Sequence, residues 1–437
     1  KMKLKAENIT MGLVDKKNSR VKRKTAEAPM TIKKLAASYK RTAFAGTLVA
    51  LAILGDSFLY AALPVHYREV GISLIMVGWL LSLNRWVRLF TNAAAGWLGS
   101  RLGWSTVFTA ALWLTAITTL GYGHTKSVLI LLLLRGQWGL CWSLLRLGGQ
   151  AAVLIESPPG RRASYMGVFT GIYRLGSLAG MVIGGYLADR VGFRMATLWL
   201  SVATALGAII GSLPPAMAGR WGAPSRDKNA SHDSFRVATG WIPKGREEWA
   251  VCICAVSLYL VTSGIVTSTV GLLVTTRLGD RIALGPMVLG AGALSGLLLS
   301  MRWVIDFLLG PLLGWHADRR GRFLVLAIGY SVIVMMLLIL SKAHGFLVIA
   351  LALVALFCSG TACAVTLDGW AGDIAGRTPG RFLPVYATWI DAGAAIGPLM
   401  GYYLSEICSL AHGYLASAFL ISIGGAICWA LSHDAQK

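Results

Sequence analysis

The stretch Gly310-Pro-Leu-Leu-Gly314-Trp-His-Ala-Asp318-Arg319-Arg320-Gly321-Arg322 closes one long apolar run and leads into another at Phe323. Glycine allows a tight turn or a close approach of two helices, aspartate accepts from free N–H groups at a helix start, and arginines favour the cytoplasmic face of a membrane. Weaker copies of the pattern lie at Gly96-Trp-Leu-Gly-Ser100-Arg101-Leu-Gly103-Trp104 and Gly185-Tyr-Leu-Ala-Asp189-Arg190-Val-Gly192. Three such turns, each between apolar runs, form a stronger signal than one.

The composition is that of a polytopic membrane protein, because 56% apolar residues and 14% charged residues over 437 positions do not describe a soluble surface. The formal charge of +22 invites a nucleic-acid partner. However, the charges lie mostly in loops and in the N-terminal tail, so no such partner is expected. All seven cysteines fall in or beside apolar runs without metal-ligand partners. We therefore expect no disulfide framework, metal or cofactor.

Twelve apolar segments are each long enough to cross about 30 Å of hydrocarbon at about 1.5 Å per residue. They span residues 42–65, 73–98, 104–123, 127–155, 164–188, 193–213, 249–276, 286–315, 323–341, 346–368, 383–404 and 414–432. The sequence therefore predicts an all-α membrane protein with twelve transmembrane helices.

The basic residues predict the orientation. Of the 41 Lys and Arg residues, 28 fall in the tail 1–41, the even-numbered loops and the C-terminus, so the positive-inside rule places both termini in the cytoplasm of a cell (inner or plasma) membrane protein. The tail carries thirteen of them and is either solvated or docked on anionic lipid head groups. Residues 214–248 are rich in Gly, Pro and basic residues and indicate a cytoplasmic linker between two bundles, 42–213 and 249–432, with a short cytoplasmic end at 433–437.

The two halves repeat one another. Ser82-Leu-Asn-Arg85-Trp-Val-Arg88 corresponds to Ser300-Met-Arg302-Trp-Val-Ile-Asp306, each leading to a Gly-Trp pair. Two glycine strings also correspond, and close helix packing explains them without any further function: Gly176, Gly180 and Gly184 in the first half, and Gly393, Gly397, Pro398 and Gly401 in the second. Duplication of this kind implies two pseudo-symmetric bundles with a binding site between them near the bilayer midplane.

The pattern Gly-x-x-x-Asp-Arg-x-Gly-Arg resembles the loop signature of the major facilitator superfamily, a large family of twelve-helix secondary transporters. Arg135-x2-Trp138-Gly139 resembles a helix-four signature of this family whose arginine faces the cavity, with Trp138 in the position of Gln, and Gly180-Met-Val-Ile-Gly184-Gly185 resembles a helix-five antiporter signature with Met181 in the position of Pro. The loop residues would form a cytoplasmic conformational latch: Gly96, Arg101 and Gly103, and Asp318, Arg319, Gly321 and Arg322. Ser100 replaces the aspartate of the first loop.

Charges inside the predicted helices are the candidate binding residues. Each would cost roughly 3 kcal/mol facing lipid, so most must face the interior, a partner or water. Six are arginines (Arg85, Arg88, Arg135, Arg146, Arg174 and Arg302) and three are aspartates (Asp56, Asp306 and Asp391). Fixed salt bridges between the halves are one interpretation. The other is that the excess of arginine binds an anionic or carboxylate-bearing solute, on which Trp138, Tyr173 and Trp389 stack unless they are interface anchors or core residues.

The three aspartates are also candidates for carrying a coupling proton. Burial favours a protonated carboxyl group, whereas a cation one turn away favours the ionised form. Asp306 has Arg302 one turn away, but Asp56 and Asp391 have no basic residue within a turn of their own helices. We therefore expect the coupling proton on Asp56 or Asp391, although Asp56 could instead be a buried hydrogen-bonded packing residue.

The sequence predicts a transporter and no enzyme activity. The first hypothesis is proton-coupled export of a small amphiphilic or anionic solute by alternating access, performed by a monomer in the bilayer. The second is uptake of an anion, favoured by the arginine excess. The third is a non-transporting membrane assembly or pigment-handling protein of the same fold, supported only by Ser100.

Overall fold

The computed structural model describes residues 32–158, 161–213, 242–378 and 382–433. Most of the basic tail, most of the linker and the last four residues lie outside this part, so the predictions made for them remain predictions. Ten residues that the sequence placed in the tail are helical, because the first helix begins at Ile32. At this end of the helix Arg41 pairs with Glu156 at 2.7 Å, a contact that apolar periodicity does not reveal.

The first half of the chain forms six elongated helical segments. Only Ile53 separates the first two helices, which run on as one segment. The helices are α2 (Ile32–Ala52), α3 (Leu54–Val70), α4 (Leu74–Leu102), α5 (Trp104–His124), α6 (Val128–Glu156), α7 (Arg162–Val191) and α8 (Phe193–Ser212).

The second half repeats this pattern. Its first segment runs through α11 (Arg246–Tyr259), the π-helical turn η1 (Leu260–Val266) and α12 (Thr267–Leu278). The other five are α13 (Ala291–Arg320), α14 (Arg322–Lys342), α15 (Phe346–Arg377), α16 (Phe382–Ile407) and α17 (Leu410–His433). The predicted start of the eighth span at residue 286 is wrong. A hairpin of β1 (Arg281–Leu284) and β2 (Met287–Gly290) precedes α13, turning at Gly285 with φ +62°.

Among the described residues, ten helices are long and apolar enough to cross a membrane by length and composition. The two segments outside this set are α4 and α16, which carry Arg85 and Arg88, and Asp391. These two helices pack against each other across the molecule. The charges that lower their hydropathy therefore face a protein partner.

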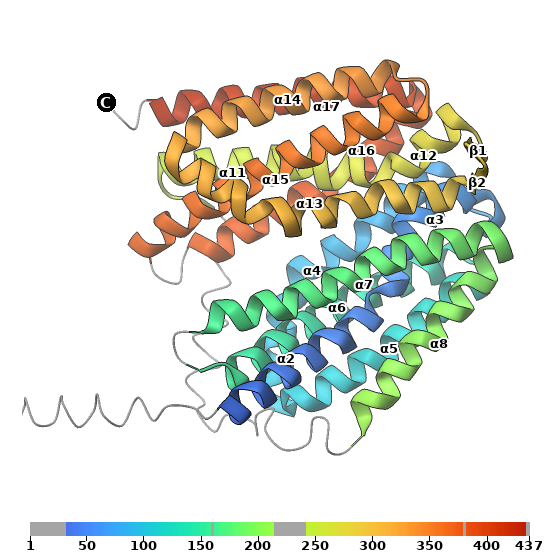
Figure 1. Cartoon of the computed structure of the whole chain (residues 1–437), viewed down its shortest axis with the longest axis vertical. Helices are drawn as coiled ribbons and strands as arrows, with labels where there is room; N and C mark the ends of the chain where they lie inside the picture. The colour runs from blue at the N-terminus through green and yellow to red at the C-terminus, as the bar shows by residue number, and fades with distance from the viewer. Residues whose placement is uncertain (1–31, 159–160, 214–241, 379–381, 434–437) are drawn as a thin grey trace, which may run out of the picture.

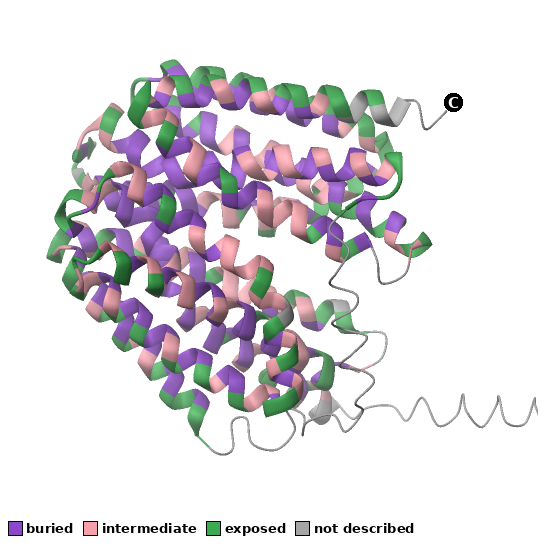
Figure 2. Cartoon of the chain, turned by 180° about the vertical axis from the view of Figure 1, so that it is seen from behind, coloured by how far each residue is buried: buried purple, intermediate pink, exposed green. Residues whose placement is uncertain are grey.

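The two bundles, α2–α8 and α11–α17, meet at the end that carries the hairpin and splay apart at the other end (Figure 1). Helix α7 packs along α13, and α4 packs along α16, where the bundles meet. Buried residues are concentrated inside the bundles, and exposed ones lie on the outer faces (Figure 2). Those faces carry large apolar side chains such as Phe90, Leu129 and Phe419, as a lipid-facing surface requires.

The glycine strings lie where two helices approach most closely. On α7, Gly176 and Gly180 face the backbones of Ala50 and Leu54. On α16, Gly397 faces the backbone of Gly264 in η1. The fifth segment thus packs on the first as the eleventh packs on the seventh, which is the packing expected of two pseudo-symmetric bundles.

We expect Gly176→Ala to destabilise the protein. The added methyl group would meet the backbone of Ala50, with only 2.7 Å to its carbonyl carbon, and such overpacking costs ~1–3 kcal/mol. The matched control is Gly167→Ala on the same helix, where a methyl group meets nothing within 4 Å. Thermal unfolding of the purified protein should show a lower Tm for the first variant only, and equal Tm values would contradict the packing.

Candidate functional site

A cavity of about 260 Å³ lies between the two bundles. Both bundles line it, with charged and aromatic side chains from predicted site residues: Asp56, Arg85, Arg88, Trp138, Tyr173, Arg174, Arg302 and Asp391. A second cavity of about 270 Å³ adjoins it and shares Arg174 and Arg302 with the first. We call them the central cavity and the side cavity.

An ion pair crosses the central cavity from one bundle to the other. Arg88 Nη2 on α4 lies 2.9 Å from Asp391 Oδ1 on α16, and the two side chains are 14% and 16% exposed. The Nε of Arg88 is buried and has no hydrogen-bond partner among the described residues. Arg88 therefore keeps one donor that the protein does not use.

Arg85 and Arg302 bind neutral oxygens on the η1 turn and its neighbours. Arg85 Nη1 donates to the carbonyl oxygens of Ser263 at 3.1 Å and Ala394 at 2.5 Å. Arg302 donates to the hydroxyl oxygens of Ser263 at 2.7 Å and Thr267 at 3.0 Å. Neutral acceptors hold these guanidinium groups in place without cancelling their charge.

Arg302 and Asp306 are one helical turn apart on α13 but do not pair with each other in the described part of the structure. Asp306 instead accepts a hydrogen bond of 2.5 Å from the Thr361 hydroxyl group and lines the side cavity. Asp368, also at the side cavity, accepts from the Tyr386 hydroxyl group at 2.8 Å. Asp306 and Asp368 thus line the side cavity, whereas Asp391 lines the central cavity.

Arg174 lies at the junction of the two cavities. Its guanidinium carbon is 5.6 Å from the centre of the Trp303 ring, and it forms no hydrogen bond or ion pair with a described residue. A guanidinium group over an aromatic face gains ~0.5–1 kcal/mol at exposed sites, which is less than a carboxylate partner supplies. Among the arginines of the central cavity, Arg174 therefore has the weakest contacts with the rest of the protein.

Arg135 does not line the central cavity. It is completely buried on α6, donates from Nε to the carbonyl oxygen of Leu80 at 2.6 Å, and forms an ion pair with Asp56 through Nη1. Asp56 is 13% exposed and reaches the cavity, with Asn84 Nδ2 at 3.5 Å from the same oxygen. Arg135 therefore positions the Asp56 carboxylate from inside the first bundle, on the side away from the cavity.

The remaining predicted residues lie away from the cavities. Arg146 is exposed on α6, and Trp389 packs edge-on against Trp249 at 5.4 Å.

In the latch loops, Gly103 and Gly321 have φ values of +85° and +91°, which glycine adopts without strain. The Cβ that a substitution would add at Gly96 meets nothing within 4 Å.

The latch arginines contact residues of their own bundles. Arg101 lies over Trp97, Arg319 lies over Trp315, and Arg322 pairs with Asp373 at 2.6 Å. Asp318 is near the end of α13, but its side chain is outside the described part of the structure. These contacts leave the latch loops without a described bond to the opposite bundle, as expected where the bundles splay.

Sequence reasoning did not identify several residues of the cavities. Tyr60, Asn84, Ser263 and Thr267 line the central cavity, and Tyr259 lines both. Ser263 and Thr267 are four residues apart on one helical face, a polar pair in an apolar segment, and this spacing could have identified them. Asp368 gave a weaker signal, because it lies at the end of a predicted span.

The bundles are joined tightly at the hairpin end by two carboxylates. Asp189, at the end of α7, accepts from the backbone N–H groups of Gly292 at 3.0 Å and Ala293 at 2.7 Å, in the first turn of α13. Glu406, at the end of α16, accepts from the N–H group of Ile75 at 3.0 Å, in the first turn of α4. We call these contacts the two inter-bundle caps. Each satisfies free N–H groups at the positive end of a helix dipole.

The cap at Asp189 has a histidine beside it. His66 Nε2 lies 3.1 Å from Asp189 Oδ1, and its Nδ1 lies 3.2 Å from Glu69 Oε2. Glu69 in turn accepts from the N–H group of Phe193 at 2.9 Å, which caps α8 within the same bundle. Within the described part of the chain, no three His, Cys, Asp or Glu side chains cluster as a metal site.

Comparison with known proteins gives a family and a fold. Residues 45–398 match the model of the Major Facilitator Superfamily. Quinolone resistance protein NorA of Staphylococcus aureus is 23% identical over 385 residues, covering 86% of this chain and 92% of NorA. An MFS-type transporter of Methanocaldococcus jannaschii is 23% identical over 86% of this chain and 94% of its own length.

One relative matches only part of the chain, and one solved structure matches nearly all of it at low identity. The tetracenomycin C resistance and export protein of Streptomyces glaucescens is 26% identical over 173 residues, which is 38% of this chain and 32% of that protein. Among solved structures, a POT family transporter in complex with a thioalcohol-conjugated peptide superposes with a TM-score of 0.71 at 11% identity, covering 91% of this chain and 96% of that one. At this identity the structural likeness shows the fold alone.

We expect Asp56→Asn to destabilise the protein by about 3–5 kcal/mol, because it leaves the buried Arg135 charge unpaired. The double variant Asp56→Asn, Arg135→Met removes both charges and should recover most of the loss. Asp306→Asn is the matched control, since the Thr361 hydroxyl group can donate equally to an amide oxygen. Thermal unfolding in detergent measures all three. If Asp56→Asn and Asp306→Asn have the same Tm, the pairing of Arg135 with Asp56 does not stabilise the protein.

Proposed function

Because the chain belongs to the Major Facilitator Superfamily, we propose that it is a secondary transporter that exports a small amphiphilic or anionic solute in exchange for protons, by alternating access. The observation that carries this proposal is Arg174, a guanidinium group between the bundles without a hydrogen-bonded partner in the described part of the protein. A carboxylate or another oxygen acceptor on the solute would supply that partner.

The walls of the central cavity support an amphiphilic solute. Four arginines and two aspartates line it, and Trp138, Trp142 and Tyr173 form an aromatic wall on the first bundle. Aromatic rings bind apolar and ring-shaped groups, while the guanidinium groups bind acceptors. In this proposal Arg174, Arg302 and Arg85 bind the polar end and the aromatic wall binds the apolar end.

The direction of transport is proposed from the relatives. Two of them carry names of drug-resistance or export proteins, for quinolones and for tetracenomycin C, and the match to the first covers 86% of this chain. Such names favour removal of an amphiphilic compound from the cell. They do not identify the solute of this chain.

We place both termini in the cytoplasm on the count of basic residues, so the splayed end would face the cytoplasm and the two inter-bundle caps would close the other side. The cavity would then load from the cytoplasm and release solute outside after the caps break and the latch loops meet. A cap can hold only one of the two arrangements, because its N–H groups belong to the opposite bundle.

Asp56 and Asp391 are the proposed proton carriers. Both reach the central cavity, but each already pairs with an arginine of the first bundle, which favours the ionised carboxylate, so in this proposal the pair has to separate before the aspartate takes up a proton. Export in exchange for protons requires that solute and proton compete. A solute that donates a hydrogen bond to Asp391 would meet this condition, because protonation removes the acceptor charge. The resulting solute has a donor for Asp391 and an acceptor for Arg174.

A second function, uptake of an anion together with protons, is favoured by the excess of arginine. If Asp391 is protonated, Arg88 loses its partner and can bind a solute anion instead. Proton and anion then bind together, so both would move in the same direction. The two functions therefore differ in whether proton and solute move in opposite directions or in the same direction.

Proteoliposomes with an imposed pH gradient test this difference, with a fluoroquinolone as probe, since it carries both a carboxyl group and an amine. If the protein exchanges solute for protons, protons leaving an acidic interior drive the probe inward, and the probe accumulates in the vesicles. Asp56→Asn or Asp391→Asn should abolish this uphill movement and retain exchange without a gradient, whereas Asp306→Asn should retain both. Accumulation only from an acidic exterior would favour anion uptake. If Asp306→Asn alone destroys uphill transport, the assignment of the proton carriers is wrong.

Removing the two inter-bundle caps should open the end that they close. Each cap is worth ~0.3–1 kcal/mol, and up to ~2 kcal/mol when partly buried, so losing one shifts the open-to-closed ratio by roughly two- to thirty-fold. A cysteine at Ser177, which lines the central cavity, reports this shift through its labelling rate from outside in a background without other cysteines. Asp189→Ala and Glu406→Ala should both raise that rate.

Glu69→Ala is the matched control for the caps, because Glu69 caps α8 inside its own bundle. Its loss should lower the Tm and leave the labelling of the cysteine at 177 unchanged. Equal labelling in the wild-type background and in both cap variants would show that the caps do not hold the closed end.

A further inference from the structure

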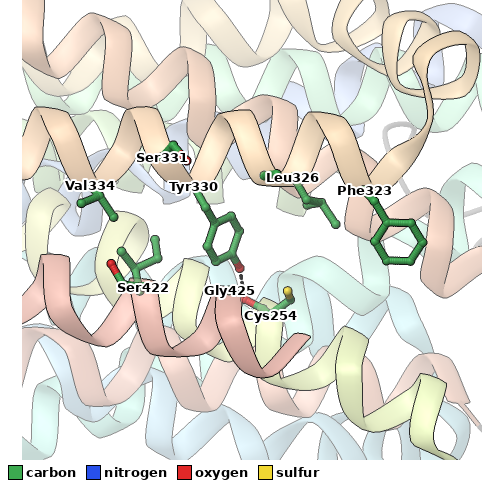
Figure 3. A pocket seen from close by; sticks show the side chains of 10 residues that line it. Cys254, Phe323, Leu326, Tyr330, Ser331, Val334, Ser422 and Gly425 are labelled. Atoms are coloured by element: carbon green, nitrogen blue, oxygen red, sulfur yellow. Dashed lines mark hydrogen bonds between the residues drawn. The ribbon is translucent and has the colours of Figure 1, made fainter. Parts of the chain in front are cut away.

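A groove of about 440 Å³ opens on the outer face of the second bundle and shares no lining residue with the two cavities. Figure 3 shows the side chains that line it. Helices α14 and α17 form its sides and α11 contributes Cys254 to it. Its apolar lining consists mainly of Phe323, Leu326, Tyr330, Val334, Ile421 and Gly425. In a membrane this face meets lipid, so the occupant of the groove comes from the bilayer unless a protein covers it.

The polar atoms of the groove are largely engaged within the protein. The Tyr330 hydroxyl group donates to the carbonyl oxygen of Cys254 at 2.7 Å, as Figure 3 shows. It also lies 3.3 Å from the Ser257 hydroxyl group, and Ser422 donates to the carbonyl oxygen of Ala418 at 2.8 Å. With these groups satisfied, the groove attracts a hydrocarbon chain rather than a polar ligand.

Small residues create the groove. Ala327 and Ser331 on α14 and Ser422 and Gly425 on α17 line it, so the two helices leave space that no side chain fills. A Cβ at Gly425 would already lie 3.0 Å from the Tyr330 ring. Space of this kind beside packed helices loses dispersion contacts unless something occupies it.

The length of the groove fits one leaflet. From Phe323 to Val334 it follows α14 over twelve residues, with a helical rise at each of the eleven steps between them. At about 1.5 Å per residue this is about 16 Å, and half of a hydrocarbon core of about 30 Å is about 15 Å. One acyl chain of one leaflet therefore has the matching length.

The charges at the Phe323 end favour an anionic head group. Arg319, Arg320 and Arg322 lie at the turn between α13 and α14, immediately before Phe323. Arg322 pairs with Asp373 at 2.6 Å and Arg319 stacks on Trp315, while Arg320 is exposed and forms no hydrogen bond or ion pair with a described residue. A basic residue near a membrane surface attracts anionic lipid head groups.

We propose that the groove between α14 and α17 is a lipid site that holds one acyl chain of an anionic phospholipid, with the phosphate group at the α13–α14 turn beside Arg320. The lipid belongs to the leaflet on the side of that turn. The site does not depend on the transported solute, since it opens on the outer face of the bundle.

Photo-crosslinking tests the site. The full chain is placed in nanodiscs with phosphatidylglycerol that carries a diazirine in its acyl chain, and labelled peptides are mapped by mass spectrometry. We expect labelling of α14 and α17 at the groove well above that of the exposed faces of α5 and α8. Ser422→Phe and Ala327→Phe fill the groove and should each reduce its labelling several-fold. Ile328→Phe, at an exposed position of α14 outside the groove, should not.

The head group is tested with phosphatidylcholine of the same chains. The groove should be labelled several-fold more by the phosphatidylglycerol probe, and Arg320→Gln should reduce that preference without changing labelling by the phosphatidylcholine probe. Equal labelling by both lipids in the wild type would overturn the anionic head group. Labelling spread evenly over all lipid-facing helices, or unchanged in both groove-filling variants while their Tm values match the wild type, would overturn the site itself.

Discussion

Hydrocarbon cannot solvate a charge, and the organisation of this protein follows from that constraint. Arginines within membrane-spanning helices need acceptors or water, and the structure supplies protein acceptors to them in three ways, with Arg174 as an exception that only stacks on Trp303. Arg135 is paired inside one bundle, Arg88 is paired across the two bundles, and Arg302 is held by hydroxyl groups. These contacts gather polar groups in or next to the space between the bundles, because a charge facing lipid would be costly. The central cavity lies in that space.

The same constraint explains why α4 and α16 face each other. Their charges make them the least suited of the long helices to lie against lipid, and mutual packing buries both. The ion pair between Arg88 and Asp391 then joins the two halves where these helices meet. A bond with one charge on each bundle is sensitive to their relative position, whereas the pair of Asp56 and Arg135 moves as one body.

Backbone packing and capping act at the ends of the molecule, where charges can reach water. At the hairpin end, Asp189 and Glu406 bind N–H groups of the opposite bundle, and Gly185 and Gly296 let α7 and α13 touch backbone to backbone. At the splayed end the latch arginines contact residues of their own bundle. The end where the bundles meet is therefore held by close backbone packing and by a few hydrogen bonds from carboxylates to N–H groups of the opposite bundle.

The sequence by itself determined the helical membrane fold, the repeat of the two halves and the segments that carry charge. These follow from hydropathy, from spacing along the chain and from the cost of a charge in lipid, all of which are local. It also pointed to Arg85, Arg88, Arg174, Arg302, Asp56 and Asp391, which the structure brings to one cavity.

Only the tertiary structure decided which charges pair. Arg302 and Asp306 are one helical turn apart, yet Arg302 reaches Ser263 and Thr267 and Asp306 reaches Thr361. Arg146 shares a face with Arg135 by spacing, yet Arg135 is fully buried and Arg146 is exposed. The roles of Asp189 and Glu406 were equally hidden, since their partners are backbone N–H groups 103 and 331 residues away. Sequence spacing describes one helix, whereas an ion pair or cap between helices depends on how two of them meet.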